Sequence, residues 1–174
     1  MAQTALIQKL IRPVPDFPKP GILFRDITPL LRDPKGFSAT IDALAEAVPG
    51  AKPHAIVGIE SRGFLFGAAL ATRLGIGFVP IRKPKKLPWK THSESYALEY
   101  GTDTIEIHQD GLARGERALV VDDLLATGGT AQAAGKLVAR CGATVAAYLF
   151  VIELEALGGR AKLEGAPVHS LVAF

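Results

Sequence analysis

The sequence contains a single cysteine, Cys141, which excludes a framework of intramolecular disulfides and favours a reducing, cytoplasmic setting. It also lacks any apolar run near the ~20 residues that a membrane-spanning helix needs. Residues 1–12 carry apolar side chains at helical spacing, but they are too few and too polar for the apolar region of a signal peptide. They predict a short amphipathic helix, and no membrane partner is expected.

Aromatic residues are also few, at 7%, and the net charge is only +3, from 20 basic and 17 acidic residues. That charge does not demand a nucleic-acid partner and suits anionic small molecules. The four histidines are scattered without the spacing of metal ligands, so we assign them no role. Cys141 is most simply a buried small residue. A chain of 174 residues fits one domain.

Apolar segments alternate with helical ones through most of the chain. The pattern predicts strands at residues 55–59, 77–81, 117–121, 144–153 and 168–173. It predicts helices at residues 34–48, 63–74 and 129–140, the first of them opened by Asp33-Pro34. This alternation indicates an α/β fold with a parallel twisted sheet flanked by helices, whose ligands bind at the carboxyl ends of the strands.

Two further regions do not follow this alternation. Prolines stiffen residues 13–21 into an extended connector, followed by a short extended segment at residues 22–24. Residues 82–93 are basic, polar and interrupted by proline, which predicts a loop. Residues 95–100 and 103–107 alternate apolar with polar side chains around Gly101-Thr102, which predicts a β-hairpin.

The strongest chemical signal is the segment ALVVDDLLATGGT at residues 118–130. An apolar strand ends in Asp122 and Asp123, and a small, glycine-containing loop then opens into a helix. Backbone amides at such a loop bind phosphate, while the acids suit sugar hydroxyls or a divalent cation. A Walker-type loop is excluded, because no Lys-Ser/Thr pair follows the glycines. The alternative is an ordinary strand–turn–helix connection. The phosphate-binding residues would be Ala126, Thr127, Gly128, Gly129 and Thr130.

This segment resembles the phosphoribosyl pyrophosphate signature of the type I phosphoribosyltransferases. Residues 15–29, 58–64 and 95–101 look like the adenine-specific members of that family. The resemblance implies a single domain with a small N-terminal hood at roughly residues 1–33 and a core at roughly 34–174. It further implies a flexible hairpin lid within roughly residues 82–108, a Mg²⁺ cofactor and a homodimer. The Mg²⁺ would be held mainly through substrate, with Asp122 and Asp123 as candidate ligands.

The resemblance also assigns a pyrophosphate site. It implies a non-proline cis peptide near Glu60-Ser61, whereas the residues alone also allow Ser61 to be an ordinary helix N-cap. A charge run is otherwise a solvated face, and for Lys85 and Lys90 that reading stands beside the functional one. Lys85 and Trp89 depart from the small or variable residues that are more usual there. The implied pyrophosphate contacts, some of them reaching into a partner subunit, are Glu60, Ser61, Arg82, Lys83 and Lys86.

The resemblance places adenine between Phe24 and Leu124, although Phe24 alone reads as a core residue. Backbone groups of Leu23 and Arg25 would bind the amino edge of the base, and Arg62 would contact the ring. The resemblance makes Glu99 an acid–base residue on the lid. The catalytic residues that it implies are Glu99 and Arg62. From the strand pattern alone, the alternative is that Glu99 is an ordinary solvent-facing glutamate.

The resemblance implies transfer of ribose 5-phosphate from phosphoribosyl pyrophosphate to adenine, giving AMP and pyrophosphate in purine salvage. Two alternatives stay open on the sequence. One is a phosphoribosyltransferase for hypoxanthine or xanthine, which would share the phosphate loop but need other groups at the base edge. The other is a domain that senses phosphoribosyl pyrophosphate without catalysis.

Overall fold

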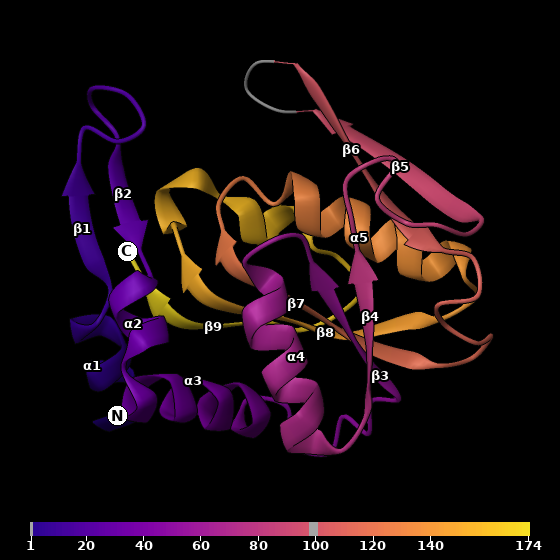
Figure 1. The fold of residues 1–174 in the computed structure, drawn as a ribbon, viewed down its shortest axis with the longest axis horizontal. Helices are drawn as coiled ribbons and strands as arrows, with labels where there is room; N and C mark the ends of the chain where they lie inside the picture. The colour runs from indigo at the N-terminus through magenta and orange to yellow at the C-terminus, as the bar shows by residue number, and fades with distance from the viewer. Residues whose placement is uncertain (1, 98–100) are drawn as a thin grey trace.

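A computed structural model of the protein describes residues 2–97 and 101–174. Its centre is a sheet of five parallel strands in the order β4-β3-β7-β8-β9 (Figure 1). These strands are β3 (Ala55–Ile59), β4 (Gly77–Ile81), β7 (Arg117–Leu125), β8 (Thr144–Glu153) and β9 (Val168–Ala173). The predicted α/β class with a parallel sheet is confirmed.

Helices cover both faces of this sheet, and alternation along β7 shows why. Val120 packs in one buried cluster with Leu137, whereas its neighbour Leu119 packs in a second cluster with Phe66. Successive strand residues point to opposite faces, so an apolar strand needs a cover on each side. The covering helices are α5 (Gly129–Arg140) on the first face and α3 (Pro34–Glu46) and α4 (Gly63–Leu74) on the second.

The N-terminal residues form an antiparallel ribbon flanked by helices, rather than only a connector. Their elements are α1 (Ala2–Lys9), β1 (Arg12–Pro15), β2 (Leu23–Asp26) and α2 (Thr28–Arg32). The predicted connector was wrong at its start, because β1 pairs along its whole length with β2. Ile7 and Leu30 are fully buried in the same cluster as Phe66 of α4, so this region shares the main core.

A second ribbon joins β5 (Thr91–Ala97) to β6 (Thr102–His108). The predicted antiparallel pairing is present among the described residues, whereas residues 98–100 of the predicted hairpin lie outside them. The loop predicted before the hairpin was wrong at residues 91–93. Those residues belong to β5, because β6 continues to His108 and offers Thr91 and His92 partners across the ribbon. In Figure 1 the β1–β2 and β5–β6 ribbons rise on the same side of the central sheet, at its two ends.

Other boundaries differ modestly from prediction. α3 ends at Glu46 instead of residue 48, and α2 was not predicted. Two short 3₁₀ turns, η1 (Glu155–Leu157) and η2 (Gly159–Lys162), were also missed. Gly75 ends α4 in a left-handed conformation, as a helix C-terminus favours. Among the helices in the described part of the chain, none has the length and apolarity to cross a membrane.

Candidate active site

The predicted phosphate loop lies between β7 and α5. Gly128 adopts a left-handed φ of 78° and caps α5, and as a glycine it has no side chain to accept a hydrogen bond from the first amides of that helix. Those amides therefore face an anion site without a competing cap. The loop surrounds a cavity of about 70 Å³ together with Asp122, so the structure brings the first acid and the phosphate loop to one place. The loop residues lining it are Ala126, Thr127, Gly128, Gly129 and Thr130.

The two acids lie within β7 rather than after it, which corrects the predicted strand end. The strand continues to Leu125 because Leu124 and Leu125 still pair with β8. Asp123 is 4% exposed and forms an ion pair with Arg62 (Nε–Oδ2 3.2 Å). Burial, reinforced by the neighbouring charge of Asp123, raises the pKa of Asp122 well above its ordinary value. Burial likewise raises the pKa of Asp123, against the opposing effect of Arg62.

Glu60 organises the basic segment that follows β4. The Glu60–Ser61 peptide is cis, as predicted, and Ser61 does not cap α4, whose cap is Arg62 without a side-chain hydrogen bond. The Glu60 carboxylate accepts hydrogen bonds from Arg82 Nε (3.1 Å), the Lys83 amide (2.9 Å) and Lys86 Nζ (2.9 Å). Despite opposing burial, these donors lower the pKa of Glu60 to about 2.

Phe24, predicted to stack on the base, lies on β2 and has Arg62 and Phe17 beside its ring. The guanidinium carbon of Arg62 lies 5.5 Å from the centroid of the Phe24 ring, and Phe17 packs edge-on against that ring at 5.1 Å. Arg62 therefore connects the predicted base site to Asp123. The Arg25 guanidinium instead stacks on the C-terminal Phe174 ring at 3.7 Å, which leaves the backbone of Arg25 as its predicted means of contacting the base.

Comparison with known proteins decides the family. A sequence model of the phosphoribosyl transferase domain matches residues 28–165. An adenine phosphoribosyltransferase of Synechococcus sp. is 60% identical over 97% of this chain and 98% of its own length. The chain belongs to the phosphoribosyltransferase family, among its adenine phosphoribosyltransferases.

Solved structures of the family agree with this assignment. The adenine phosphoribosyltransferase of Thermoanaerobacter pseudethanolicus superposes with a TM-score of 0.95 at 54% identity, covering 98% of this chain and 99% of its own. The Saccharomyces cerevisiae enzyme, solved with an imino-altritol bisphosphate and adenine, gives a TM-score of 0.93 at 46% identity, with 98% and 99% covered. The predicted family and fold are both confirmed.

Gly159 of η2 packs against the phosphate loop of this phosphoribosyltransferase, a contact that was not predicted from the sequence. A β-carbon on Gly159 would lie 2.2 Å from the Ala126 carbonyl oxygen and 2.8 Å from the Gly128 nitrogen. One on Gly128 would lie 2.4 Å from the Gly159 oxygen. Two backbones therefore touch where any side chain would separate them. The adjacent glycines at 158 and 159 were the only local signal.

The basic segment also reaches the β5–β6 ribbon. The Lys83 ammonium forms an ion pair with Asp103 of β6, to which the Tyr96 hydroxyl also donates a hydrogen bond (3.2 Å). Neither Tyr96 nor Asp103 was singled out from the sequence. Glu99, the predicted acid–base residue, lies outside the described residues.

Substituting Glu60→Gln is expected to lower the free energy of unfolding by about 1–2 kcal/mol at pH 7, since charged hydrogen bonds are lost from a partly solvent-screened cluster. The pKa of Glu60 is about 2 in the fold against 4.5 for an ordinary glutamate. Its stabilisation is therefore complete above the unfolded pKa and is lost as the pH falls through both values. Urea unfolding of both proteins at several pH values between 7 and 3 should show the difference shrinking below pH 4.5.

The matched control is Glu164→Gln, which changes an exposed glutamate away from these cations. It should leave the free energy of unfolding unchanged at every pH tested. A Glu60→Gln difference that stays constant from pH 7 down to acid would show that charge is not the source of the effect.

Proposed function

We propose that the protein is an adenine phosphoribosyltransferase, a pentosyltransferase that moves ribose 5-phosphate from phosphoribosyl pyrophosphate to N9 of adenine. The products are AMP and pyrophosphate, as in purine salvage. The observation that carries the proposal is the cavity that Asp122 shares with the phosphate loop. Amide donors beside a carboxylate suit the phosphate and hydroxyls of one sugar phosphate. A Trypanosoma brucei relative, 25% identical, was solved with AMP, pyrophosphate and ribose-5-phosphate.

The reaction is a substitution at the anomeric carbon of the ribose. The bond from N9 to that carbon forms while the bond to the pyrophosphate oxygen breaks, and pyrophosphate leaves with the electron pair. Asp122 and Asp123 hold the ribose hydroxyls, and residues 126–130 hold the 5-phosphate. Negative charge grows on the leaving group, so donors placed around it stabilise the transition state. These are the cations Arg82, Lys83 and Lys86 and the backbone at Glu60-Ser61.

Base selection depends on the ribbon that carries Phe24. The Phe24 ring stacks on one face of adenine and Leu124 packs on the other, while Arg62 contacts the base from its position between Phe24 and Asp123. Backbone groups of Leu23 and Arg25 bind the amino edge. A carbonyl that accepts from the amino group opposes the 6-oxo group of hypoxanthine, and such a mismatch rejects an analogue by about 10⁴-fold.

The donor set fits a Mg²⁺ ion bound mainly through substrate. Within residues 2–97 and 101–174 no group of three or more His, Cys, Asp or Glu could hold a metal. Asp122 and Asp123 offer adjacent carboxylates, and one or two carboxylates with substrate oxygens are the usual surroundings of Mg²⁺. When bound, the ion supplies positive charge that offsets the charge of the pyrophosphoryl group.

We also propose a cytoplasmic homodimer in which the basic segment reaches partly into the partner's site. The single cysteine supports a reducing compartment. The support for the dimer is the family to which the chain belongs. Sedimentation of the purified protein tests it, and a monomer at micromolar concentration with full activity would contradict it.

The function is tested by incubating the protein with phosphoribosyl pyrophosphate, Mg²⁺ and one base at a time, with nucleotides separated by chromatography. AMP should form from adenine, while hypoxanthine, guanine and xanthine should give no more than about 10⁻⁴ of that rate. Preferred use of a 6-oxo purine would assign the protein to another specificity. Binding of phosphoribosyl pyrophosphate without turnover of any base would indicate a sensing domain.

Glu99→Gln should lower turnover by about 10²-fold or more, because a general acid–base residue contributes about that much. We propose that Glu99 accepts the proton that the purine loses as N9 attacks, a step that glutamine cannot perform. The KM for adenine should change far less than kcat. Steady-state kinetics over pH 6–9 check this, with the exposed Glu164→Gln as the control. An unchanged kcat would return Glu99 to the role of a solvent-facing residue.

A further inference from the structure

Each cation assigned to pyrophosphate already has a carboxylate partner within the protein. Arg82 and Lys86 pair with Glu60, at 3.1 and 2.9 Å, and Lys83 pairs with Asp103. Glu60 lies in the turn between β3 and α4, whereas Asp103 reaches Lys83 from the β5–β6 ribbon. The Lys83–Asp103 ion pair therefore joins the basic segment after β4 to the β5–β6 ribbon.

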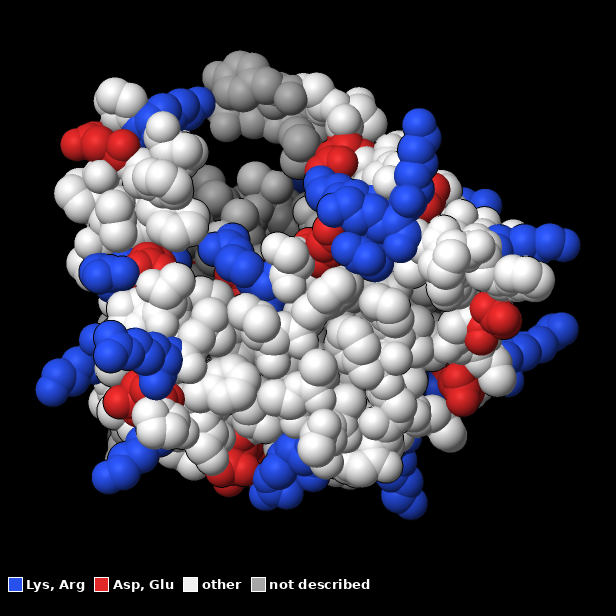
Figure 2. All heavy atoms as spheres, in the orientation of Figure 1, with Lys and Arg blue, Asp and Glu red and all other residues white. Residues whose placement is uncertain are grey.

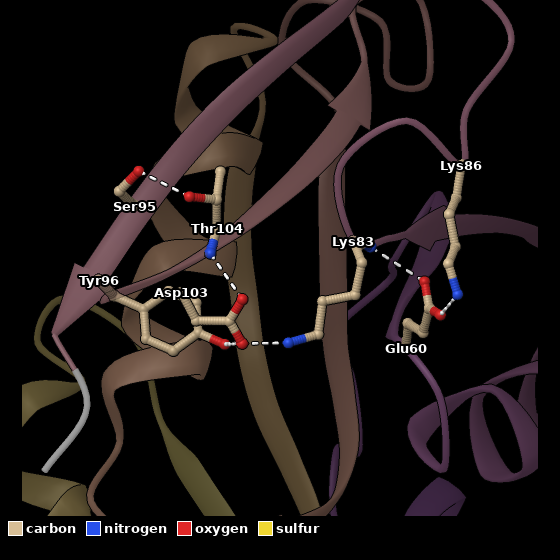
Figure 3. A network of polar contacts seen from close by, with 7 residues as sticks. All are labelled: Glu60, Lys83, Lys86, Ser95, Tyr96, Asp103 and Thr104. Carbon is tan, nitrogen blue, oxygen red and sulfur yellow. Dashed lines mark hydrogen bonds and ion pairs between the residues drawn. The ribbon is translucent and has the colours of Figure 1, made fainter. Parts of the chain in front are cut away.

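Figure 3 shows how Asp103 is held. One carboxylate oxygen accepts a hydrogen bond from the Thr104 amide (2.8 Å), while the other accepts from the Tyr96 hydroxyl (3.2 Å) and meets the Lys83 ammonium. The Lys83 amide in turn donates to Glu60 at 2.9 Å. The backbone of Lys83 is thus bound to Glu60, the carboxylate that Arg82 and Lys86 share, and its side chain is turned to the ribbon.

The same contact lies close to the phosphate loop. The Tyr96 ring comes within 3.3 Å of the place where a β-carbon on Gly129 would stand. Burial raises the pKa of Tyr96, and the neighbouring Thr130 hydroxyl partly offsets that effect. Asp103 therefore lies between the basic segment and the residues proposed to bind the 5-phosphate. Its negative charge there repels the phosphate groups of a bound substrate.

We propose that Asp103 competes with the pyrophosphoryl group for Lys83, and so weakens pyrophosphate binding enough to let the product leave. This inference rests on the proposed function and extends it to a residue that has no role in the chemistry. A carboxylate beside the ammonium neutralises it and repels an arriving phosphate, so each anion lowers the affinity for the other. The side chain of Lys83 is 42% exposed and can turn between the two partners.

Asp103→Asn removes the charge and keeps the shape. Product inhibition by pyrophosphate should become tighter by about 3- to 5-fold, the size expected of one partly exposed ion pair. The KM for phosphoribosyl pyrophosphate should also fall, whereas the affinity for AMP should stay unchanged. If Asp103 served only to stabilise the ribbon, its replacement would instead weaken the binding of pyrophosphate, phosphoribosyl pyrophosphate and AMP alike. The measurement is initial-rate inhibition with inorganic pyrophosphate, supported by calorimetric titration of AMP.

Ser95→Ala is the matched control. It removes another cross-strand contact of the same ribbon, between the Ser95 and Thr104 hydroxyls (2.9 Å), without touching Lys83. Its inhibition constant for pyrophosphate should equal that of the unchanged protein. Thermal melting of each variant verifies that the fold persists, and Asp103→Ser serves as a second uncharged replacement, expected to act in the same direction.

A double-mutant cycle identifies the partner of Asp103. In a Lys83→Met background, Asp103→Asn should give no further tightening, because the cation for which the anions compete is gone. Unchanged or weaker pyrophosphate inhibition in Asp103→Asn and Asp103→Ser would overturn the inference, as would tightening that persists without Lys83. Failure of the unchanged protein to make AMP would instead overturn the proposed function, so the two failures are distinct.

Discussion

Gly159→Ala is expected to raise the KM for phosphoribosyl pyrophosphate by about 10- to 100-fold, which corresponds to the loss of one charge-assisted hydrogen bond to phosphate. The new methyl group would lie 2.2 Å from the Ala126 carbonyl oxygen and 2.8 Å from the Gly128 nitrogen. Neither atom belongs to a side chain that could turn away, so the phosphate loop itself must shift. The KM for adenine should change much less, because Phe24 lies on a separate ribbon.

Gly158→Ala separates this steric effect from backbone strain. Gly158 has a φ of 63°, so alanine there is strained, but its β-carbon would meet nothing within 4 Å. This control should lose some thermal stability and keep its KM for phosphoribosyl pyrophosphate. Steady-state kinetics and melting temperatures of the two variants provide the comparison. If both raise KM equally, general destabilisation of the η1–η2 segment, and not displacement of the phosphate loop, would be the cause.

The contrast between Gly128 and Gly159 shows what the sequence could predict. Gly128 stands in a local pattern of strand end, small loop and helix start, and each part of that pattern follows from rules that act over a few residues. The contact of Gly159 with Ala126 joins backbones that are distant along the chain. It exists only after β8 and η2 have folded beside the loop, so no local pattern records it.

The cations show the same division. The basic segment was visible in the sequence, and its family resemblance suggested a pyrophosphate site. The partners of these cations could not be predicted from the sequence, because the pairing of Lys83 with Asp103 depends on how the β5–β6 ribbon packs against the basic segment after β4. The predicted end of β7 was wrong for a related reason. β7 runs on through Asp122 and Asp123 because neighbouring β8 is long enough to pair with it, which overrides the polar character of the acids.

Asp123→Asn is expected to lower kcat by about 10- to 100-fold, the effect of replacing a charged hydrogen-bond acceptor with a neutral one. In the proposed reaction Asp123 holds a ribose hydroxyl while positive charge develops on the sugar. Asparagine would fill the same space but could not offset that charge. It would also release Arg62, which pairs with Asp123 at 3.2 Å and lies over Phe24. Stopped-flow or steady-state assays with saturating adenine and phosphoribosyl pyrophosphate measure the loss.

The stability of the Asp123→Asn variant distinguishes a functional role of Asp123 from a structural one. Burial raises the pKa of both Asp122 and Asp123, so ionising them opposes folding, and the fold loses stability as the pH rises through their pKa values. Removing one charge at pH 7 should therefore leave the melting temperature equal or higher, even though Arg62 loses its partner. A catalytic loss combined with unchanged or greater stability is typical of a residue kept for function at the expense of the fold. A variant that instead melted early, or kept its full kcat, would show that Asp123 serves the architecture and not the sugar.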